Sequence, residues 1–130
     1  MRVATIDIGT NSVLLLIAEV TPGGLRPIVE QATITRLGQR VDASGELAPE
    51  ARERTLACLA GYAASIRGAG VDATAAVGTS AMRDAGGAFV DEVSLLLDTK
   101  AEVISGPPRS RADVSGLAVW AGGHRPAAGV

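Results

Sequence analysis

The chain has 130 residues, of which 47 % are apolar and 20 % charged, and its net charge is −2. This length supports one domain with a modest core, and the apolar fraction excludes a disordered chain. Only 2 % of the residues are aromatic and the basic residues form no stripe, so nucleic acid is not the expected ligand. No apolar run approaches the roughly 20 residues that cross a bilayer and no signal peptide is visible, so we expect a cytoplasmic protein without a membrane partner.

The amino terminus is the most informative segment, because two apolar runs flank a short polar turn. β-Branched residues favour a buried strand over 2–8, and a second apolar strand is expected over 12–20. Between them only Gly9 lacks a Cβ, so it can adopt a positive φ and let another group approach the backbone. Three residues with further donors follow it, namely Thr10, Asn11 and Ser12. Their N–H groups and side chains would converge on one point, which suits anionic oxygens such as those of a phosphate.

Asp7 stands at the carboxyl end of the first predicted strand. A carboxylate there can hold Mg²⁺ directly or through water, because Mg²⁺ in phosphate sites is bound through one or two carboxylates and the phosphate. The competing interpretation is an ordinary hairpin, in which Asp7 caps its own turn and Gly9 serves only the turn geometry.

A third strand is predicted over 26–35, after a turn at 22–24, which makes the first three strands an antiparallel meander. Arg36 and Arg40 then leave the sheet. Two interpretations stay open for these cations: a solvated loop, or phosphate contacts at the rim of a cleft.

A helix is predicted to begin near Pro49, which suits a first helical turn, and to end at Gly68 and Gly70. One apolar stripe of this helix should face the sheet, formed by Leu56, Leu59, Ala63 and Ile66. The lone Cys58 falls within this helical pattern and is interpreted as a small buried apolar residue.

A fourth strand over 71–77 leads into a predicted helix for which Thr79 or Ser80 is the cap. The strand would place a helix N-terminus beside the carboxyl edge of the sheet, where anions bind favourably. Arg83 would lie in the first turn of that helix, where a cation opposes the helix dipole unless an anion is near. We therefore favour a ligand contact for Arg83.

The helical pattern continues over 89–97, and a fifth short strand is expected over 101–105. The resulting order, βββαβαβ, predicts an α/β domain with a mixed sheet. This plan resembles half of an actin-like (ribonuclease H-like) ATPase-type domain.

Four motifs occur in order along the chain: D-I-G-T-N-S (7–12), T-R-L-G (35–38), V-G-T-S-A-M-R-D-A (77–85) and E-V-I-S-G (102–106). Together they closely resemble the amino-terminal domain of the exopolyphosphatase and guanosine pentaphosphatase (Ppx/GppA) family, over residues 1–106. The resemblance implies hydrolysis of a terminal phosphoanhydride in polyphosphate or guanosine pentaphosphate, with Mg²⁺ and an attacking water. The motifs do not distinguish these two substrates.

The same resemblance implies roles for individual residues. Asp7 would organise the metal, and the turn from Gly9 to Ser12 would hold the phosphate. Thr79, Ser80 and Arg83 would lie near the cleft.

The chain departs from the family pattern after Gly106. Family members carry a Glu-rich helix there, one Glu of which is the general base, whereas this chain has Pro107 and Pro108. The catalytic residue is therefore unknown, and the second glycine-rich phosphate turn and the second domain of the family do not follow. Residues 107–130 contain one acidic residue, three arginines and no Glu or Lys, so we expect a divergent, disordered tail. A frameshift near codon 106, or a natural short variant, would explain it.

Three functions are consistent with these observations. The family motifs favour a phosphoanhydride hydrolase over an actin-like kinase, for which no acceptor-binding Asp is evident. A third function, binding of phosphate ligands or a partner without turnover, fits a chain that lacks the general base. We expect the 130-residue chain alone to have little or no activity and to self-associate through an exposed face that meets the second domain in the family.

Overall fold

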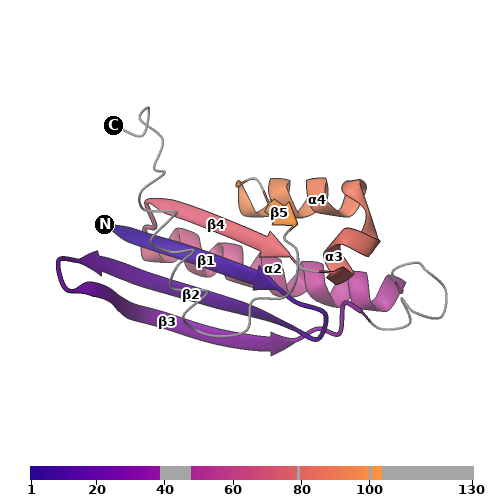
Figure 1. Cartoon of the computed structure of the whole chain (residues 1–130), viewed down its shortest axis with the longest axis horizontal. Coiled ribbons are helices and arrows are strands. Elements are labelled where there is room, and N and C mark those ends of the chain that lie inside the picture. The colour runs from indigo at the N-terminus through magenta and orange to yellow at the C-terminus, as the bar shows by residue number, and fades with distance from the viewer. Residues whose placement is uncertain (39–47, 79, 100, 104–130) are drawn as a thin grey trace.

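The computed structural model describes residues 1–38, 48–78, 80–99 and 101–103 (Figure 1). Its elements are β1 (Arg2–Ile8), β2 (Ser12–Thr21), β3 (Gly24–Ile34), α2 (Pro49–Ala69), β4 (Ala73–Gly78), α3 (Ser80–Ala85), α4 (Gly87–Leu97) and β5 (Ala101–Val103). Among these described helices, none has the length and apolar character to cross a membrane. The predicted tail at 107–130 lies outside the described residues.

The five described strands form one mixed sheet in the order β3-β2-β1-β4-β5. β1 pairs antiparallel with β2, and β2 pairs antiparallel with β3. β4 is parallel to β1, and β5 is parallel to β4. The meander and the α/β plan predicted from the sequence are therefore confirmed. β3 begins two residues before its predicted start, and β4 begins two residues after its own.

At one edge of this sheet lie strand ends that are far apart in the sequence. Ile8, the last residue of β1, is in register with Gly78, the last residue of β4, and Gly78 is in register with Val103 of β5. Ser12 at the start of β2 is in register with Ile34 at the end of β3. The D-I-G-T-N-S, T-R-L-G and V-G-T-S-A-M-R-D-A motifs therefore leave the sheet at this same edge, which we call the carboxyl edge.

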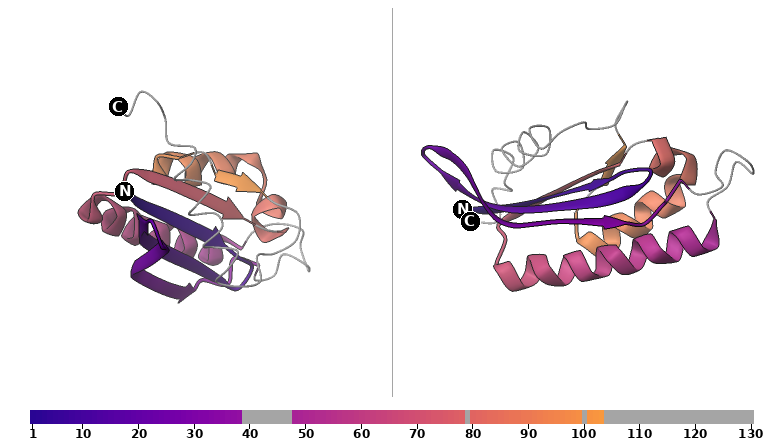
Figure 2. Two further views of the ribbon diagram at one scale, coloured as in Figure 1. Left: turned by 60° about the vertical axis from the view of Figure 1, so that its left-hand side comes forward. Right: turned by 90° about the horizontal axis from the view of Figure 1, so that it is seen from below.

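The hydrophobic core lies between the sheet and its helices. Figure 2 shows α2 and α4 on the same side of the sheet. Alternate residues of β1, namely Ala4, Ile6 and Ile8, belong to one buried cluster with Leu59 of α2 and Phe89 and Val93 of α4. The side chains of the residues next to them, Val3, Thr5 and Asp7, must point to the opposite face, because successive residues of a strand alternate.

Helix α2 begins at Pro49 as predicted, and its C-cap Gly70 has a φ of 66°. That left-handed conformation costs glycine little, which explains why the helix ends there. Gly68 remains helical, so the prediction that it also ends the helix was wrong. The predicted apolar stripe is confirmed: Leu59 and Ala63 are buried, and Leu56 and Ile66 pack against the same cluster. Cys58 is only partly buried and packs against the cluster too.

The predicted single helix after β4 is two helices. Gly86, with a φ of 90°, separates α3 from α4. Because α3 is only six residues long, Arg83 lies in its last turn, where a cation is favourable to the helix dipole. The argument that Arg83 opposes the dipole was therefore wrong, and a long helix does not begin at this point of the carboxyl edge.

Candidate functional site

The turn between β1 and β2 is held in shape by its own backbone. The N–H of Gly9 donates to the carbonyl oxygen of Ser12 at 2.9 Å. A Cβ on Gly9 would lie 3.0 Å from that same oxygen. Gly9 does not have a positive φ, so that part of the prediction was wrong. The close approach of another backbone group, the second part, is confirmed and explains why glycine fits this position.

A second segment, 35–38, closes over the turn. The N–H groups of Thr35 and Arg36 both donate to the carbonyl oxygen of Asn11, at 3.0 and 2.9 Å. The N–H of Gly38 donates to the carbonyl oxygen of Thr10 at 2.9 Å. A Cβ on Gly38 would lie 2.3 Å from Cγ2 of Thr10, so only glycine allows this approach without moving the threonine side chain. The D-I-G-T-N-S and T-R-L-G motifs thus form one unit.

These contacts determine which backbone groups of the turn stay available. The carbonyl oxygens of Thr10, Asn11 and Ser12 all accept hydrogen bonds from within the unit. Within the part of the chain that the structure describes, the N–H groups of Thr10 and Asn11 donate to no backbone carbonyl. Both residues are exposed. The turn therefore has N–H groups available as donors, while its carbonyl oxygens already accept hydrogen bonds. An anion site requires this combination.

Asp7 lies directly beside this turn, next to the end of β1. It is only 6 % exposed. Its partners in the sheet register are apolar, Leu14 on β2 and Val77 on β4. Over the described ranges, no group of three or more His, Cys, Asp or Glu residues is placed to hold a metal ion.

A buried hydroxyl also lies within the unit. Thr35 is 1 % exposed, and its Oγ1 atom has no hydrogen-bond partner among the residues that the structure describes. Burial of a hydroxyl without a partner costs roughly 1–3 kcal/mol, and such groups call for a water, an ion or a ligand. The residues of this edge therefore fit a polar ligand.

Arg36 adopts an unusual backbone conformation in the same segment. Its φ is 52°, and its side chain is exposed. A residue with a Cβ pays about 1–2 kcal/mol for the left-handed region, so the two hydrogen bonds to Asn11 hold Arg36 there against strain. Arg40, the other cation predicted at the cleft rim, lies outside the described residues.

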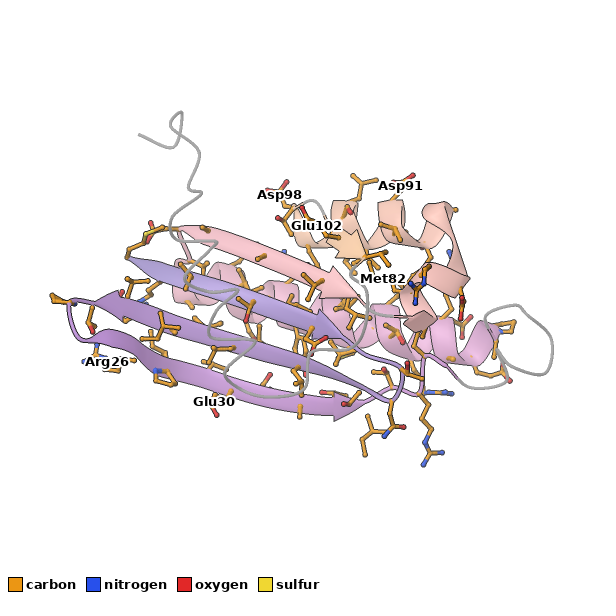
Figure 3. All side chains as sticks on the ribbon, in the orientation of Figure 1. Arg26, Glu30, Met82, Asp91, Asp98 and Glu102 are labelled. Atoms are coloured by element: carbon orange, nitrogen blue, oxygen red, sulfur yellow. The ribbon has the colours of Figure 1, made fainter. Side chains whose placement is uncertain are left out.

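The loop after β4 reaches the carboxyl edge by a different kind of contact. A Cβ on Gly78 would lie 2.2 Å from Sδ and 2.7 Å from Cβ of Met82, which is fully buried (Figure 3). Close packing of α3 on the end of β4 thus requires glycine. Ser80 begins α3, and Arg83 is exposed on it. Thr79 and the side chain of Ser80 lie outside the described residues, so the predicted approach of these residues to the turn stays a prediction.

Two residues of α2 that the motifs do not include contact this unit or the strand residues next to it. Nε of Arg54 donates to the carbonyl oxygen of Thr35 at 2.9 Å. The hydroxyl of Tyr62 donates to the carbonyl oxygen of Val13 at 3.0 Å and lies 2.8 Å from Oγ1 of Thr33. Tyr62 is the chain's single tyrosine, and a buried tyrosine hydroxyl requires a partner. That was the one sequence signal that could have singled it out.

Comparison with known proteins places these features in context. A model of the Ppx/GppA phosphatase family matches residues 16–126. Exopolyphosphatase 2 of Mycobacterium tuberculosis is 46 % identical over 87 residues, which cover 64 % of this chain and 27 % of that protein. A guanosine-5′-triphosphate,3′-diphosphate pyrophosphatase of Photobacterium profundum is 29 % identical over 122 residues, covering 92 % of this chain and 24 % of that protein. The chain thus spans about a quarter of the length of these relatives.

Solved structures agree with this assignment. The crystal structure of the Aquifex aeolicus Ppx/GppA phosphatase, type II variant, superposes with a TM-score of 0.74 at 39 % identity. The superposition covers 81 % of this chain and 36 % of that one. The predicted family resemblance and the predicted actin-like fold are therefore confirmed. The family match begins after the β1–β2 turn and continues 20 residues past Gly106, so the division of the chain at 106 stays a prediction.

Proposed function

Because the chain belongs to the Ppx/GppA phosphatase family, we propose that it supplies the phosphate-binding, amino-terminal part of a phosphoanhydride hydrolase. One observation carries this proposal. Within the described residues the N–H groups of Thr10 and Asn11 donate to no backbone carbonyl, while the N–H groups of residues 35–38 donate to the carbonyl oxygens of Thr10 and Asn11. An anionic phosphate oxygen is the complementary ligand for such a turn.

The proposed substrates are polyphosphate and guanosine pentaphosphate. Their terminal phosphates share the chemistry that the turn would recognise, several anionic oxygens on one phosphorus atom. The two kinds of named relative, an exopolyphosphatase and a guanosine-5′-triphosphate,3′-diphosphate pyrophosphatase, support this pair. A backbone turn contacts the phosphate alone, so we do not expect this part of the protein to choose between the two.

Asp7 is the proposed ligand for Mg²⁺. When bound, Mg²⁺ would neutralise charge on the phosphate oxygens. The sheet fixes the backbone of Asp7, which is in register with Leu14 on β2 and Val77 on β4. It is adjacent in sequence to the turn, so a metal held there and a phosphate held by Thr10 and Asn11 would be close neighbours.

In the proposed reaction the oxygen of a water attacks the terminal phosphorus, and the bond from that phosphorus to its bridging oxygen breaks. A general base must take the water's proton. The segment 107–130 contains no Glu, and the base is therefore not assigned to this chain. Removing general-base assistance typically costs about 10²–10⁴-fold in rate. We propose that the 130-residue chain binds phosphate and turns it over little or not at all; self-association stays a prediction.

The proposal is tested by calorimetric titration of the 130-residue chain with sodium tripolyphosphate, with and without Mg²⁺. We expect binding that Mg²⁺ strengthens, and phosphate release near the uncatalysed rate. Asp7→Asn should remove the strengthening by Mg²⁺, because it replaces a carboxylate with a neutral amide.

Asp91→Asn is the matched control, because Asp91 is exposed on α4 and away from the turn (Figure 3). It removes the same charge and should keep the effect of Mg²⁺. Equal loss in both variants, or no binding by the unaltered chain, would contradict the proposed site. Robust Mg²⁺-dependent phosphate release would contradict the proposed inactivity alone.

A further inference from the structure

The β1–β2 turn and the segment 35–38 are supported by residues that lie outside the two motifs. Residues 35–38 hold the turn, but they follow the end of β3 and pair with none of the described strands. They also include Arg36, whose φ of 52° is unfavourable for a residue with a side chain. A segment under such strain keeps its shape only if the surroundings determine it.

Helix α2 supplies that support at two points. Arg54 donates through Nε to the carbonyl oxygen of Thr35, the residue whose own N–H donates to Asn11 of the turn. Tyr62 donates to the carbonyl oxygen of Val13, which is the second residue of β2 after the turn. The two contacts therefore flank the turn, one on the closing segment and one on the outgoing strand.

Tyr62 is placed for this contact with little freedom. It is only 4 % exposed and belongs to the main hydrophobic cluster. Its hydroxyl has one proton, which it donates to Val13, so the 2.8 Å contact with Thr33 is a hydrogen bond that Thr33 donates. One side chain of α2 thereby ties β2 and β3 together at the carboxyl edge.

We infer that Arg54 and Tyr62 are positioning residues for phosphate binding. They contact no ligand themselves, and they hold the backbone of 9–13 and 35–38 in the arrangement that presents the N–H groups of Thr10 and Asn11. This inference rests on the proposed function, and it deepens that function by assigning part of the affinity to α2. Preorganised donors bind an anion more tightly because no ordering is required at the time of binding.

The chain offers a closely matched control for Arg54. Arg52 lies two residues earlier on the same helix, is also an arginine, and forms an ion pair with Glu92 of α4. That contact joins the two helices and does not touch the turn. Arg54→Gln and Arg52→Gln therefore remove the same charge from the same helix, and only the first removes a hydrogen bond to residues 35–38.

The first readout needs no ligand. Amide hydrogen exchange is measured by NMR for Thr35, Arg36 and Gly38, whose N–H groups donate to the turn, with Gly70 and Val20 as distant reference amides. In Arg54→Gln we expect exchange at 35, 36 and 38 to accelerate about tenfold, the size expected for one lost charge-assisted hydrogen bond, with the reference amides unchanged. Arg52→Gln should leave all of these amides unchanged.

The second readout is affinity for tripolyphosphate in the presence of Mg²⁺. Arg54→Gln should weaken binding about tenfold and Tyr62→Phe about fivefold, while Arg52→Gln stays within about twofold of the unaltered chain. Tyr62→Phe changes no charge, so its effect cannot come from the loss of long-range attraction for the anion. It also provides an independent variant if Arg54→Gln does not fold.

The outcomes separate the two proposals. If the unaltered chain does not bind tripolyphosphate, the proposed function is wrong, whatever the exchange rates are. If it binds and Arg54→Gln equals Arg52→Gln in exchange and affinity, the positioning role is wrong and the proposed function stands. Faster exchange at all amides, the reference amides included, would likewise overturn the positioning role, because it would mean general destabilisation.

Discussion

Two hairpin turns of the same sheet differ in what holds them. Among the described residues the β2–β3 turn is closed by local contacts: Oγ1 of Thr21 donates to the carbonyl oxygen of Gly24 at 2.8 Å, and a Cβ on Gly23 would meet nothing within 4 Å. The β1–β2 turn is closed by residues 35–38, which are more than twenty positions away in the sequence. Both turns are exposed. Among the described residues, it is the β1–β2 turn that is held by a segment distant in the sequence.

This difference indicates how a functional turn can be recognised. A turn that only reverses the chain requires hydrogen bonds between near neighbours. Hydrogen bonds from a remote segment to the carbonyl oxygens of a turn are not needed for the reversal, and under the proposed function they leave the N–H groups of the turn for the phosphate. A Cβ on Gly9 would also lie 3.0 Å from the carbonyl oxygen of Ser12, and one on Gly38 would lie 2.3 Å from Cγ2 of Thr10, whereas the β2–β3 turn has open space at Gly23 and Gly24.

The largest expected effect is a difference in stability when one glycine of each turn is replaced by alanine. Gly9→Ala places a Cβ 3.0 Å from the carbonyl oxygen of Ser12, and this overpacking should lower the free energy of unfolding by roughly 1–3 kcal/mol. Gly23→Ala meets open space without a positive φ, so it should be neutral or stabilising by about 0.4–1 kcal/mol. Urea unfolding of both variants measures the difference. Equal losses would mean that the turns are equivalent.

A smaller effect is expected where the neighbour can move. Gly38→Ala places a Cβ 2.3 Å from Cγ2 of Thr10, and a rotation of the threonine side chain relieves that clash at a cost of about 0.5–1.5 kcal/mol. We therefore expect little loss of stability and a clear loss of tripolyphosphate affinity, measured by calorimetry. Unchanged affinity in a folded Gly38→Ala variant would show that the approach of residues 35–38 is not needed for binding.

The smallest expected effect is a pH dependence of stability that comes from Tyr62, whose hydroxyl donates to Val13 next to the β1–β2 turn. Burial raises the pKa of Tyr62 above the ordinary value of 10.0, and the hydrogen bond from Thr33 opposes that rise. As pH rises, the unfolded chain therefore loses the Tyr62 proton at a lower pH than the folded chain does. The stability that Tyr62 contributes is present below pH 10 and is lost as the pH rises from there through the higher pKa of the folded state. Melting temperatures between about pH 9 and pH 11 should fall more steeply for the unaltered chain than for Tyr62→Phe.

The parts of the fold that follow from local patterns could be predicted from the sequence. Runs of β-branched and apolar residues identify β1 and β2, and Pro49 and Gly70 mark the ends of α2 because their backbone preferences act locally. The break at Gly86 was missed although the pair Gly86-Gly87 was a visible signal, because the apolar period continues across it.

The candidate site could be predicted only in part. The residues of the turn were identified from the motif, but the reason for Gly9 was wrong, since the need is space for the oxygen of Ser12 and not a positive φ. The contacts of Arg54 and Tyr62 depend on how α2 lies across the sheet. Such contacts between segments that are distant in sequence leave no local periodicity for a pattern to detect.

Phosphate binding by the β1–β2 turn is tested most directly by an NMR titration of the chain with tripolyphosphate and Mg²⁺, following the backbone amides of both hairpin turns. We expect the largest shifts at the amides of Thr10 and Asn11, and no shifts at those of Gly23 and Gly24. Shifts of similar size in both turns, or shifts confined to residues outside the β1–β2 turn, would contradict phosphate binding by that turn.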